Sequence, residues 1–248
     1  MPTLLQGAYT PLQRLLWLTV GYYAKSIDQL GLFDRLEEDG LFGAYRFRFM
    51  DRYTGSKDIV DSVGEINFLE EAIGISLRAA LRVLDIGAGY GRLMHRLVTA
   101  FPTTVSGYCT DAIPESTFLS EYYLGLRQLT DRVTVVPLDQ VEQTLGDNAA
   151  PVDLVTNVHS FSECTGAAIA WWLDRAVAVQ ARYLFVVPNP YHNGGTQLLS
   201  READGSFHDI SPLIEQRGFR LTHRAPKCRD ESLHPFGINT YYYLFART

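Results

Sequence analysis

The sequence lacks most of the features that mark secreted, membrane, metal-binding and nucleic-acid-binding proteins. Its 248 residues contain only three cysteines, and no two of them form a C-x-x-C pair, which argues against a zinc site or a disulfide framework. There is no dense run of Lys or Arg, and 28 acidic residues outnumber 22 basic ones, so we expect no nucleic-acid partner. The apolar stretch at 15–20 is too short to span a bilayer, and no basic region followed by an apolar core marks a signal peptide. We therefore expect a cytoplasmic protein without a membrane partner.

The pattern of apolar residues changes near residue 80. Before it, the spacing of apolar residues predicts one or two helices over 11–38 and another over 57–79, with 39–56 as loop or short turns. After it, apolar runs alternate with helical segments, which predicts an α/β fold with a mainly parallel sheet. We divide the chain into a helical N-terminal cap, 1–78, and a sheet domain, 79–248. The predicted strands are 81–86, 104–110, 132–137, 152–158, 182–187, 219–225 and 240–246, and the predicted helices are about 91–100, 114–129, 140–145, 167–181 and 209–217.

The most informative segment is 83–92, which reads Val-Leu-Asp-Ile-Gly-Ala-Gly-Tyr-Gly-Arg. A short apolar strand ends in Asp85, and Gly87, Gly89 and Gly91 follow at alternate positions. Glycine has no Cβ, so this backbone can turn sharply and approach a ligand closely. Dinucleotide-binding proteins favour G-x-G-x-x-G with a pyrophosphate on the next helix, whereas an acid before the first glycine would repel a pyrophosphate and hold an ammonium group. The pattern resembles the first motif of class I S-adenosylmethionine (SAM)-dependent methyltransferases.

Polar residues also follow the next three predicted strands, at the sheet edge where such folds bind ligands. Asp111 lies about twenty residues beyond the glycines, a position from which an acid accepts hydrogen bonds from ribose hydroxyls. By the resemblance, Asp139 is expected near the adenine. The alternative for these acids is structural, because Asp commonly ends strands and starts turns. We assign to the cofactor site Asp85, Gly87, Ala88, Gly89, Gly91, Asp111, Ala112, Asp139 and Asn157.

Three further segments extend the resemblance. They are KDIVDSVGEINFLE at 57–70, DAIPESTFLSEYYL at 111–124 and DLVTNVHSFSE at 153–163. Together they are similar to the proposed sugar O-methyltransferases of bacteria, a class I group. This resemblance implies a Rossmann-like methyltransferase fold with a seven-stranded, mostly parallel sheet and a helical N-terminal cap. It also implies SAM as the methyl donor, S-adenosylhomocysteine (SAH) as the product, and a small-molecule acceptor such as a sugar.

His159 is the candidate general base, because it follows the fourth strand and faces the expected position of the sulfonium. A neutral imidazole can take the proton of a hydroxyl as the new C–O bond forms. Glu163, four residues later, is a candidate to orient the imidazole. The alternatives are a buried histidine satisfied by the backbone and, because 160–163 reads S-x-x-E, a helix capping box.

Residues in two other segments are candidates to bind the acceptor. Asn189 and His192 lie in a polar loop after the fifth strand, where loops often line a pocket. Glu65 lies in the expected helix that precedes the sheet, and we expect it to meet the amino group of the donor or an acceptor hydroxyl. The alternatives are a Gly-terminated turn for the loop and a solvated helix face for Glu65. Aromatic residues of the cap are candidates for a pocket wall or for the core (Tyr22, Tyr23, Phe42, Tyr45, Phe47 and Phe49).

Other functions stay open at this point. A metal-assisted reaction would draw on Asp153, His159, Glu163 and Asn189, but no tight acidic pair is present, so we expect no metal. An amine acceptor, a nicotinamide-dependent oxidoreductase and a non-catalytic partner subunit are the competing hypotheses. A homodimer through the N-terminal helices is also expected.

Overall fold

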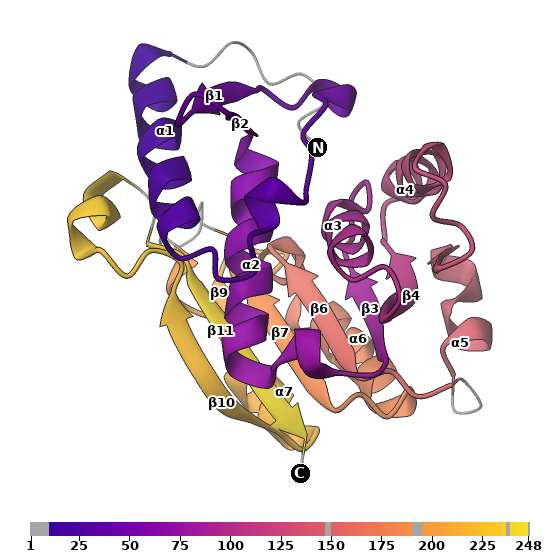
Figure 1. Cartoon of the computed structure of the whole chain (residues 1–248). Coiled ribbons are helices and arrows are strands. Elements are labelled where there is room, and N and C mark those ends of the chain that lie inside the picture. The colour runs from indigo at the N-terminus through magenta and orange to yellow at the C-terminus, as the bar shows by residue number, and fades with distance from the viewer. Residues whose placement is uncertain (1–9, 147–149, 190–194, 237–238, 248) are drawn as a thin grey trace.

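A seven-stranded mixed sheet forms the centre of the molecule (Figure 1). The computed structural model describes residues 10–146, 150–189, 195–236 and 239–247. The strand order is β10-β11-β7-β6-β3-β4-β5. Each predicted strand is confirmed to within two residues, as β3 (Leu81–Ile86), β4 (Val105–Thr110), β5 (Val133–Val136), β6 (Leu154–Val158), β7 (Tyr183–Val187), β10 (Phe219–Pro226) and β11 (Tyr241–Arg247).

The neighbouring strands β7, β6, β3, β4 and β5 run parallel to one another. The strand β11 lies between β7 and β10 and is antiparallel to both. A parallel strand covered on both faces needs a nearly continuous apolar run. In β3, Leu81, Val83, Leu84 and Ile86 are each at most 1% exposed. Because these strands point the same way, their carboxyl ends meet at one edge, which brings the segments after β3, β4 and β6 together.

Helices cover both faces of the sheet. One face carries α2 (Lys57–Ile73), α3 (Arg92–Ala100) and α4 (Pro114–Leu126). The other carries α5 (Val141–Thr144), α6 (Gly166–Ala178) and α7 (Ser211–Gln216). Successive residues of β3 point to opposite faces, so Val83 packs in the core cluster of Leu97, and Leu84 packs in that of Leu173. Each face therefore has its own hydrophobic core.

The N-terminal part contains α1 (Pro11–Ser26) and then α2. Thr10 and Gln13 form a capping box at the start of α1, and Ser56 caps α2, which ends at Gly74 in the left-handed conformation. In Figure 1, α2 runs along the front of the sheet, with α6 and α7 behind it. Phe68 of α2 packs 5.5 Å from Phe185 of β7, measured between ring centroids. The core of this face thus continues into the N-terminal segment.

Two short hairpins were not predicted. The segment 39–56, expected as loop, contains β1 (Phe47–Phe49) paired with β2 (Tyr53–Gly55). A second hairpin joins β8 (Leu199–Arg201) to β9 (Phe207–Asp209). Strands of three residues are too short to display a period of two. The first hairpin is fixed by tertiary packing, because the Phe47 ring lies against Gly21 and Gly55, where no side chain intervenes.

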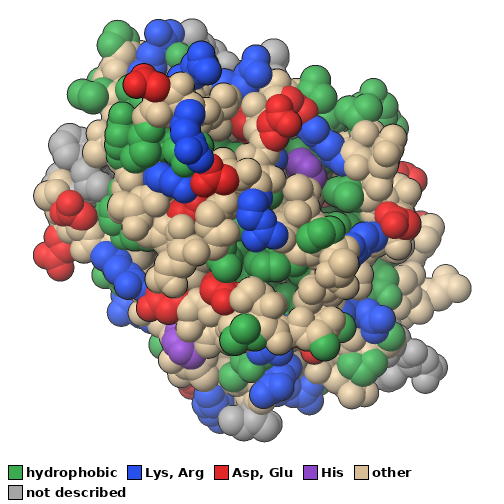
Figure 2. All heavy atoms as spheres, viewed as in Figure 1, with side chains coloured by type: hydrophobic (Ala, Val, Ile, Leu, Met, Phe, Trp, Pro, Cys, Tyr) green, Lys and Arg blue, Asp and Glu red, His purple; other side chains and the backbone are tan. Residues whose placement is uncertain are grey.

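The surface shows both charge signs. On the face drawn in Figure 2, Lys and Arg side chains alternate with Asp and Glu, and the described residues form no continuous basic area there. Among the helices that the structure describes, none combines the length and the hydropathy of a membrane span.

Candidate active site

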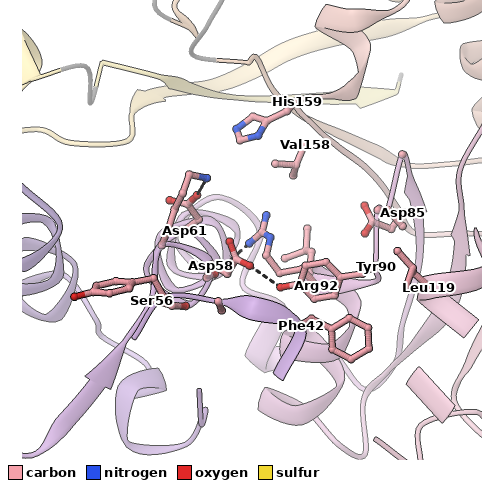
Figure 3. Close-up of a pocket in the computed structure, with 17 residues that line it drawn as sticks. Phe42, Ser56, Asp58, Asp61, Asp85, Tyr90, Arg92, Leu119, Val158 and His159 are labelled. Carbon is pink, nitrogen blue, oxygen red and sulfur yellow. Dashed lines mark hydrogen bonds and ion pairs between the residues drawn. The ribbon is translucent and has the colours of Figure 1, made fainter. Parts of the chain in front are cut away.

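A cavity of about 210 Å³ opens at the carboxyl ends of β3 and β6, beneath α2 and the segment around Phe42 (Figure 3). Its wall includes the turn that follows β3, from Gly87 to Tyr90. Asp85, Arg92 and His159 also line it. The structure thus brings the glycine motif and the candidate base to one cavity, as the order of the strand ends predicts.

The three motif glycines all have positive φ, at 70° for Gly87, 59° for Gly89 and 86° for Gly91. L-residues with a side chain rarely adopt this conformation, so glycine is required for the turn. A Cβ on Gly87 would lie 2.0 Å from Ser160 Oγ, whereas a Cβ on Gly89 would meet nothing within 4 Å. The turn therefore packs tightly against the segment after β6 at Gly87, and at Gly89 the backbone is open to a ligand.

Gly87→Ala should destabilise the protein by several kcal/mol, because positive φ strains alanine by about 1–3 kcal/mol and the clash with Ser160 adds to that cost. Urea unfolding measures the change. Gly125→Ala in α4 is the matched control, since a Cβ there meets nothing within 4 Å and its φ is ordinary. The control should be neutral or stabilise by up to about 1 kcal/mol. Equal stability of the two variants would contradict the packing described for Gly87.

Asp85 is buried at the end of β3 and accepts a hydrogen bond of 2.7 Å from Thr156 Oγ1. Burial raises the pKa of Asp85 to about 7, although the Thr156 hydrogen bond opposes the shift. A carboxylate held in this way gains from a cationic ligand, because the ligand charge offsets the loss of hydration.

Asp111 fixes the same turn from the end of β4. Its carboxylate accepts hydrogen bonds from Gly89 N–H at 3.0 Å and from Ile113 N–H at 2.9 Å. Burial raises the pKa of Asp111, and these two hydrogen bonds oppose the increase. Ala112 is exposed beside it. Asp139 is exposed after β5, is not among the residues that line the cavity, and its predicted contact with adenine stays a prediction.

Asn157 ties two strand ends together. Its amide donates to Ile86 O at 2.9 Å and to Ser160 Oγ at 2.6 Å, and its side-chain oxygen accepts from Phe161 N–H at 2.9 Å. The side chain is fully buried and its hydrogen-bond donors are used. Asn157 thus positions the turn after β6; it is not among the residues that line the cavity, and its predicted contact with the cofactor stays a prediction.

His159 has a positive φ of 73°, and its N–H donates to Val187 O at 2.7 Å. Such a φ is uncommon for a residue with a side chain and carries strain. The imidazole lines the cavity, and no described residue hydrogen-bonds to it. Burial, together with the positive charges of Lys57, Arg92 and Lys227, lowers the pKa of His159 to about 3. The ring is therefore neutral at physiological pH and its nitrogens are available to a ligand.

In the structure Glu163 contacts Asn189 and not His159, and its role in orienting the imidazole stays a prediction. It is exposed, and its Oε1 accepts a hydrogen bond of 2.9 Å from Asn189 Nδ2. The chain after His159 forms a 3₁₀ helix over Ser160–Glu163, so the capping box is not formed either and α6 is capped by Thr165 instead. Asn189 is buried but does not line the cavity. His192 lies outside the described residues.

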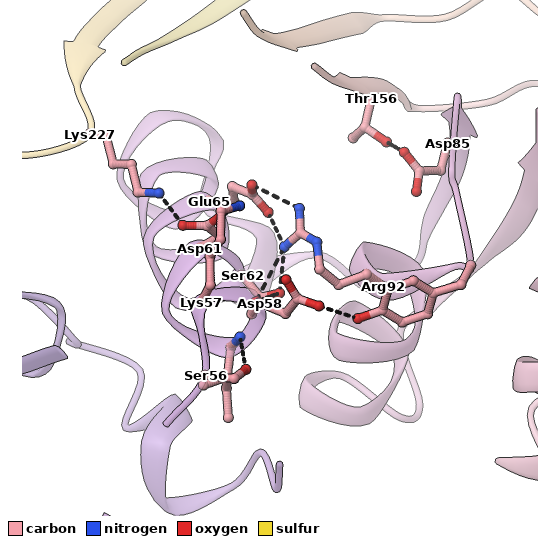
Figure 4. A network of polar contacts seen from close by, with 12 residues as sticks. Ser56, Lys57, Asp58, Asp61, Ser62, Glu65, Asp85, Arg92, Thr156 and Lys227 are labelled. Carbon is pink, nitrogen blue, oxygen red and sulfur yellow. Dashed lines mark hydrogen bonds and ion pairs between the residues drawn. The ribbon is translucent and has the colours of Figure 1, made fainter. Parts of the chain in front are cut away.

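A polar network joins α2 to the glycine turn (Figure 4). Arg92 donates to both carboxylate oxygens of Glu65, at 2.9 and 3.0 Å, and to Ser62 Oγ at 2.7 Å. The Tyr90 hydroxyl donates to Asp58 Oδ2 at 2.6 Å. Glu65 was expected to meet a ligand, but its carboxylate is occupied by Arg92 and it is not among the residues that line the cavity. The Glu65 charge instead holds the Arg92 guanidinium at the cavity wall.

A second part of the network surrounds Asp61, which lines the cavity with Lys57. The Asp61 carboxylate pairs with Lys57 Nζ at 2.8 Å and with Lys227 Nζ. Burial alone would raise the pKa of Asp61, but the charges of Lys227 and Lys57 hold it well below the ordinary range. These residues were missed in the sequence, although Lys57, Asp61 and Glu65 recur every four residues and so share one helix face.

Two of the cap aromatics, Phe42 and Tyr45, line the cavity. Phe42 has a φ of 65° and stacks on Tyr90, with ring centroids 5.9 Å apart and planes at 11°. Phe47 and Phe49 belong to the core, as the alternative reading proposed. Within the described part of the chain, no three His, Cys, Asp or Glu side chains gather in a way that would hold a metal ion.

Solved structures resemble this chain along most of its length. A proposed sarcosine dimethylglycine methyltransferase from Galdieria sulphuraria matches with a TM-score of 0.54 and 15% identity, over 93% of this chain and 97% of that one. Magnesium protoporphyrin IX methyltransferase from Synechocystis PCC 6803, solved with SAH, matches with a TM-score of 0.52 and 13% identity, over 96% and 99%. A SAM-dependent methyltransferase from Aquifex aeolicus matches with a TM-score of 0.50 and 16% identity, over 74% and 88%.

No protein-family model matches the sequence, and no curated protein matches it. At identities of 13–16%, the likeness to solved structures establishes the fold. The chain has the α/β fold of the SAM-dependent methyltransferases.

Proposed function

We propose that this protein is a SAM-dependent O-methyltransferase that transfers a methyl group to a hydroxyl of a sugar or a related small molecule. The observation that carries the proposal is the His159 imidazole, which lines the cavity beside the glycine turn and hydrogen-bonds to no described residue. The imidazole is neutral and can accept a hydroxyl proton, although a pKa of about 3 makes it a weaker base than ordinary histidine.

The charged groups of the cavity match the ends of the proposed donor. Asp85 is the carboxylate for the ammonium group, and Arg92, held by Glu65, is the cation for the donor carboxylate. Burial alone would lower the pKa of Arg92, but the charge of Glu65 raises it, so the guanidinium stays charged. Asp111, which already fixes Gly89, retains acceptor capacity for ribose hydroxyls.

When bound, SAM supplies the activated methyl group on its sulfonium. The chain supplies placement and proton transfer. An in-line displacement requires the acceptor oxygen close to the methyl carbon and collinear with the breaking bond, and the cavity walls hold the two partners in that relation. His159 takes the hydroxyl proton as the new C–O bond forms, a contribution of about 10²–10⁴-fold.

The direct test is incubation of the protein with SAM carrying a labelled methyl group and a panel of deoxysugars, glycosides and polyketide alcohols. We expect a product heavier by one labelled methyl group, together with SAH. Amine analogues of the same acceptors are the comparison, since an amine that reacts better than its alcohol would favour N-methylation. Tight binding of NAD in place of SAM, or SAM binding with no turnover on any acceptor, would contradict the proposal.

SAM binding should depend on pH through Asp85. With the pKa of Asp85 at about 7, the carboxylate that holds the ammonium is mostly protonated at pH 6 and mostly ionised at pH 8. The affinity for SAM should therefore be about tenfold weaker at pH 6 than at pH 8. Calorimetry at the two pH values measures this. Asp85→Asn should bind weakly at both, and Asp131→Asn, at an exposed site outside the cavity lining, should keep the wild-type pH dependence. A tenfold difference that persists in Asp85→Asn would refute the role of this carboxylate.

A further inference from the structure

A second cavity, of about 200 Å³, lies where α1 and α2 meet the ends of β10 and β11. Three aromatic side chains contribute to its wall, Tyr23, Phe68 and Tyr242, together with Ile27 and Pro226. Ligand sites are typically mostly apolar and carry a few placed polar groups. The proposed methyl transfer does not account for this cavity.

Tyr242 provides one such polar group. Its side chain is 3% exposed, and its hydroxyl has no hydrogen-bond partner among the described residues. A Cβ on Gly64 would lie 2.6 Å from this hydroxyl, and both residues line the cavity. Glycine is unfavourable inside a helix, so its presence in α2 keeps room for the Tyr242 hydroxyl. A buried hydroxyl donor without an acceptor destabilises the folded state by its lost hydration, so an occupant of the cavity that accepts this hydrogen bond would be stabilised.

A trapped water is a poor partner for this donor. Buried waters normally make two to four hydrogen bonds to polar groups. Asn67, the other buried polar side chain of the wall, already donates both amide hydrogens, to Asp28 and Val63 O, and accepts from Gln29 N–H. Tyr23 already accepts from Arg229 N–H. Among the described residues of the wall, the Tyr242 hydroxyl is thus the buried hydroxyl without a partner, and it lies among aromatic rings.

The second cavity adjoins the candidate active site through one ion pair. Lys227 lines the second cavity and pairs with Asp61, which lines the first. The Asp61 side chain is 4% exposed, so this ion pair lies buried between the two cavities. Glu71 and Arg229 form an exposed ion pair at the rim of the second cavity. The buried Lys227–Asp61 pair thus separates the second cavity from the candidate active site.

We propose that the second cavity is a separate binding site for a small uncharged molecule. Its occupant is an uncharged ring or short apolar chain with one oxygen that accepts a hydrogen bond from Tyr242. The charged groups of the wall are already paired, so an ionic occupant would gain no free counter-charge there.

The test is a titration of the full-length protein with 4-fluorobenzyl alcohol, followed by ¹⁹F NMR, with and without SAH. We expect saturable binding of this probe, weakened about fivefold in Tyr242→Phe by loss of the hydrogen bond. Tyr241→Phe is the matched control, because it removes a hydroxyl from the neighbouring residue of β11, which does not line the cavity. Its affinity should equal that of the wild type.

Gly64→Ala is a second variant, whose added methyl group would crowd the Tyr242 hydroxyl and reduce probe binding. Thermal melts establish that each variant is folded. Absence of saturable binding, or equal affinities for the wild type and Tyr242→Phe, would overturn the assignment of the cavity. The outcome is separable from the proposed function, because probe binding requires no methyl transfer. A protein that binds the probe through Tyr242 but never binds SAM would refute the methyltransferase alone.

Discussion

Replacing His159 with alanine should slow methyl transfer by about 10²–10⁴-fold and leave the affinity for SAM nearly unchanged. In the proposed mechanism, the imidazole takes the acceptor proton, whereas the glycine turn, Asp85 and Arg92 hold the donor; all of them line the cavity. Single-turnover rates with labelled SAM measure the first quantity and calorimetry the second. Because the pKa of His159 is lowered to about 3, its titration should produce no limb in the pH–rate profile between pH 5 and 8.

Two further variants separate the lost base from a disturbed backbone. His159→Asn keeps a side chain that tolerates positive φ but cannot act as a base, and it should be as slow as the alanine variant. His223→Ala removes an exposed histidine of β10 and should react at the wild-type rate. Wild-type turnover in His159→Asn would exclude His159 as the base and would favour an acceptor that needs no deprotonation, such as an amine.

Arg92→Met should cost about 3–5 kcal/mol of folding free energy, because it leaves the Glu65 carboxylate buried without its counter-charge. The Glu65 side chain is only 2% exposed, so water cannot replace the guanidinium. Urea unfolding at pH 7.5 measures the loss. The cost should shrink at pH 5, since a carboxylate without its cation in this environment binds a proton more readily in the folded state than in the unfolded one.

The double variant Arg92→Met/Glu65→Leu tests the origin of that cost. Replacing both members of a buried ion pair by apolar residues is often neutral or stabilising, so the double variant should recover most of the lost stability. SAM binding should stay impaired, because the cation proposed for the donor carboxylate is gone. A loss below about 1 kcal/mol in the single variant would mean that Glu65 is solvated or protonated despite its burial.

The sheet and the glycine turn were predictable because their signals are local. In β3, the apolar run and the acid and glycines that follow it are contiguous in the chain, and the required positive φ explains why glycine recurs there. The order of the strand ends then brings Asp85, Asp111 and His159 to one edge. The contacts of Asp85 and His159 with a ligand remain predictions.

The other parts of the site depend on contacts between residues distant in sequence. The four-residue spacing of Lys57, Asp61 and Glu65 indicates a shared helix face, but nothing local identifies Arg92 and Lys227 as their partners. The pairing of Glu163 with Asn189 was missed for the same reason, because a 3₁₀ helix carries Glu163 toward the segment after β7.

The side chains of Tyr90 and Arg92, from the glycine turn and the residue after it, both hydrogen-bond to α2, at Asp58 and Glu65 respectively. As a consequence, the turn and the helix form one cooperative unit. A ligand that binds only when the turn is in place stabilises the closed state of the turn and the helix together. Ligand binding should therefore make local opening of the N-terminal segment rarer. Conversely, fraying of α2 would free the Tyr90 and Arg92 side chains together, so the stability of this helix affects the wall of the cavity beneath it.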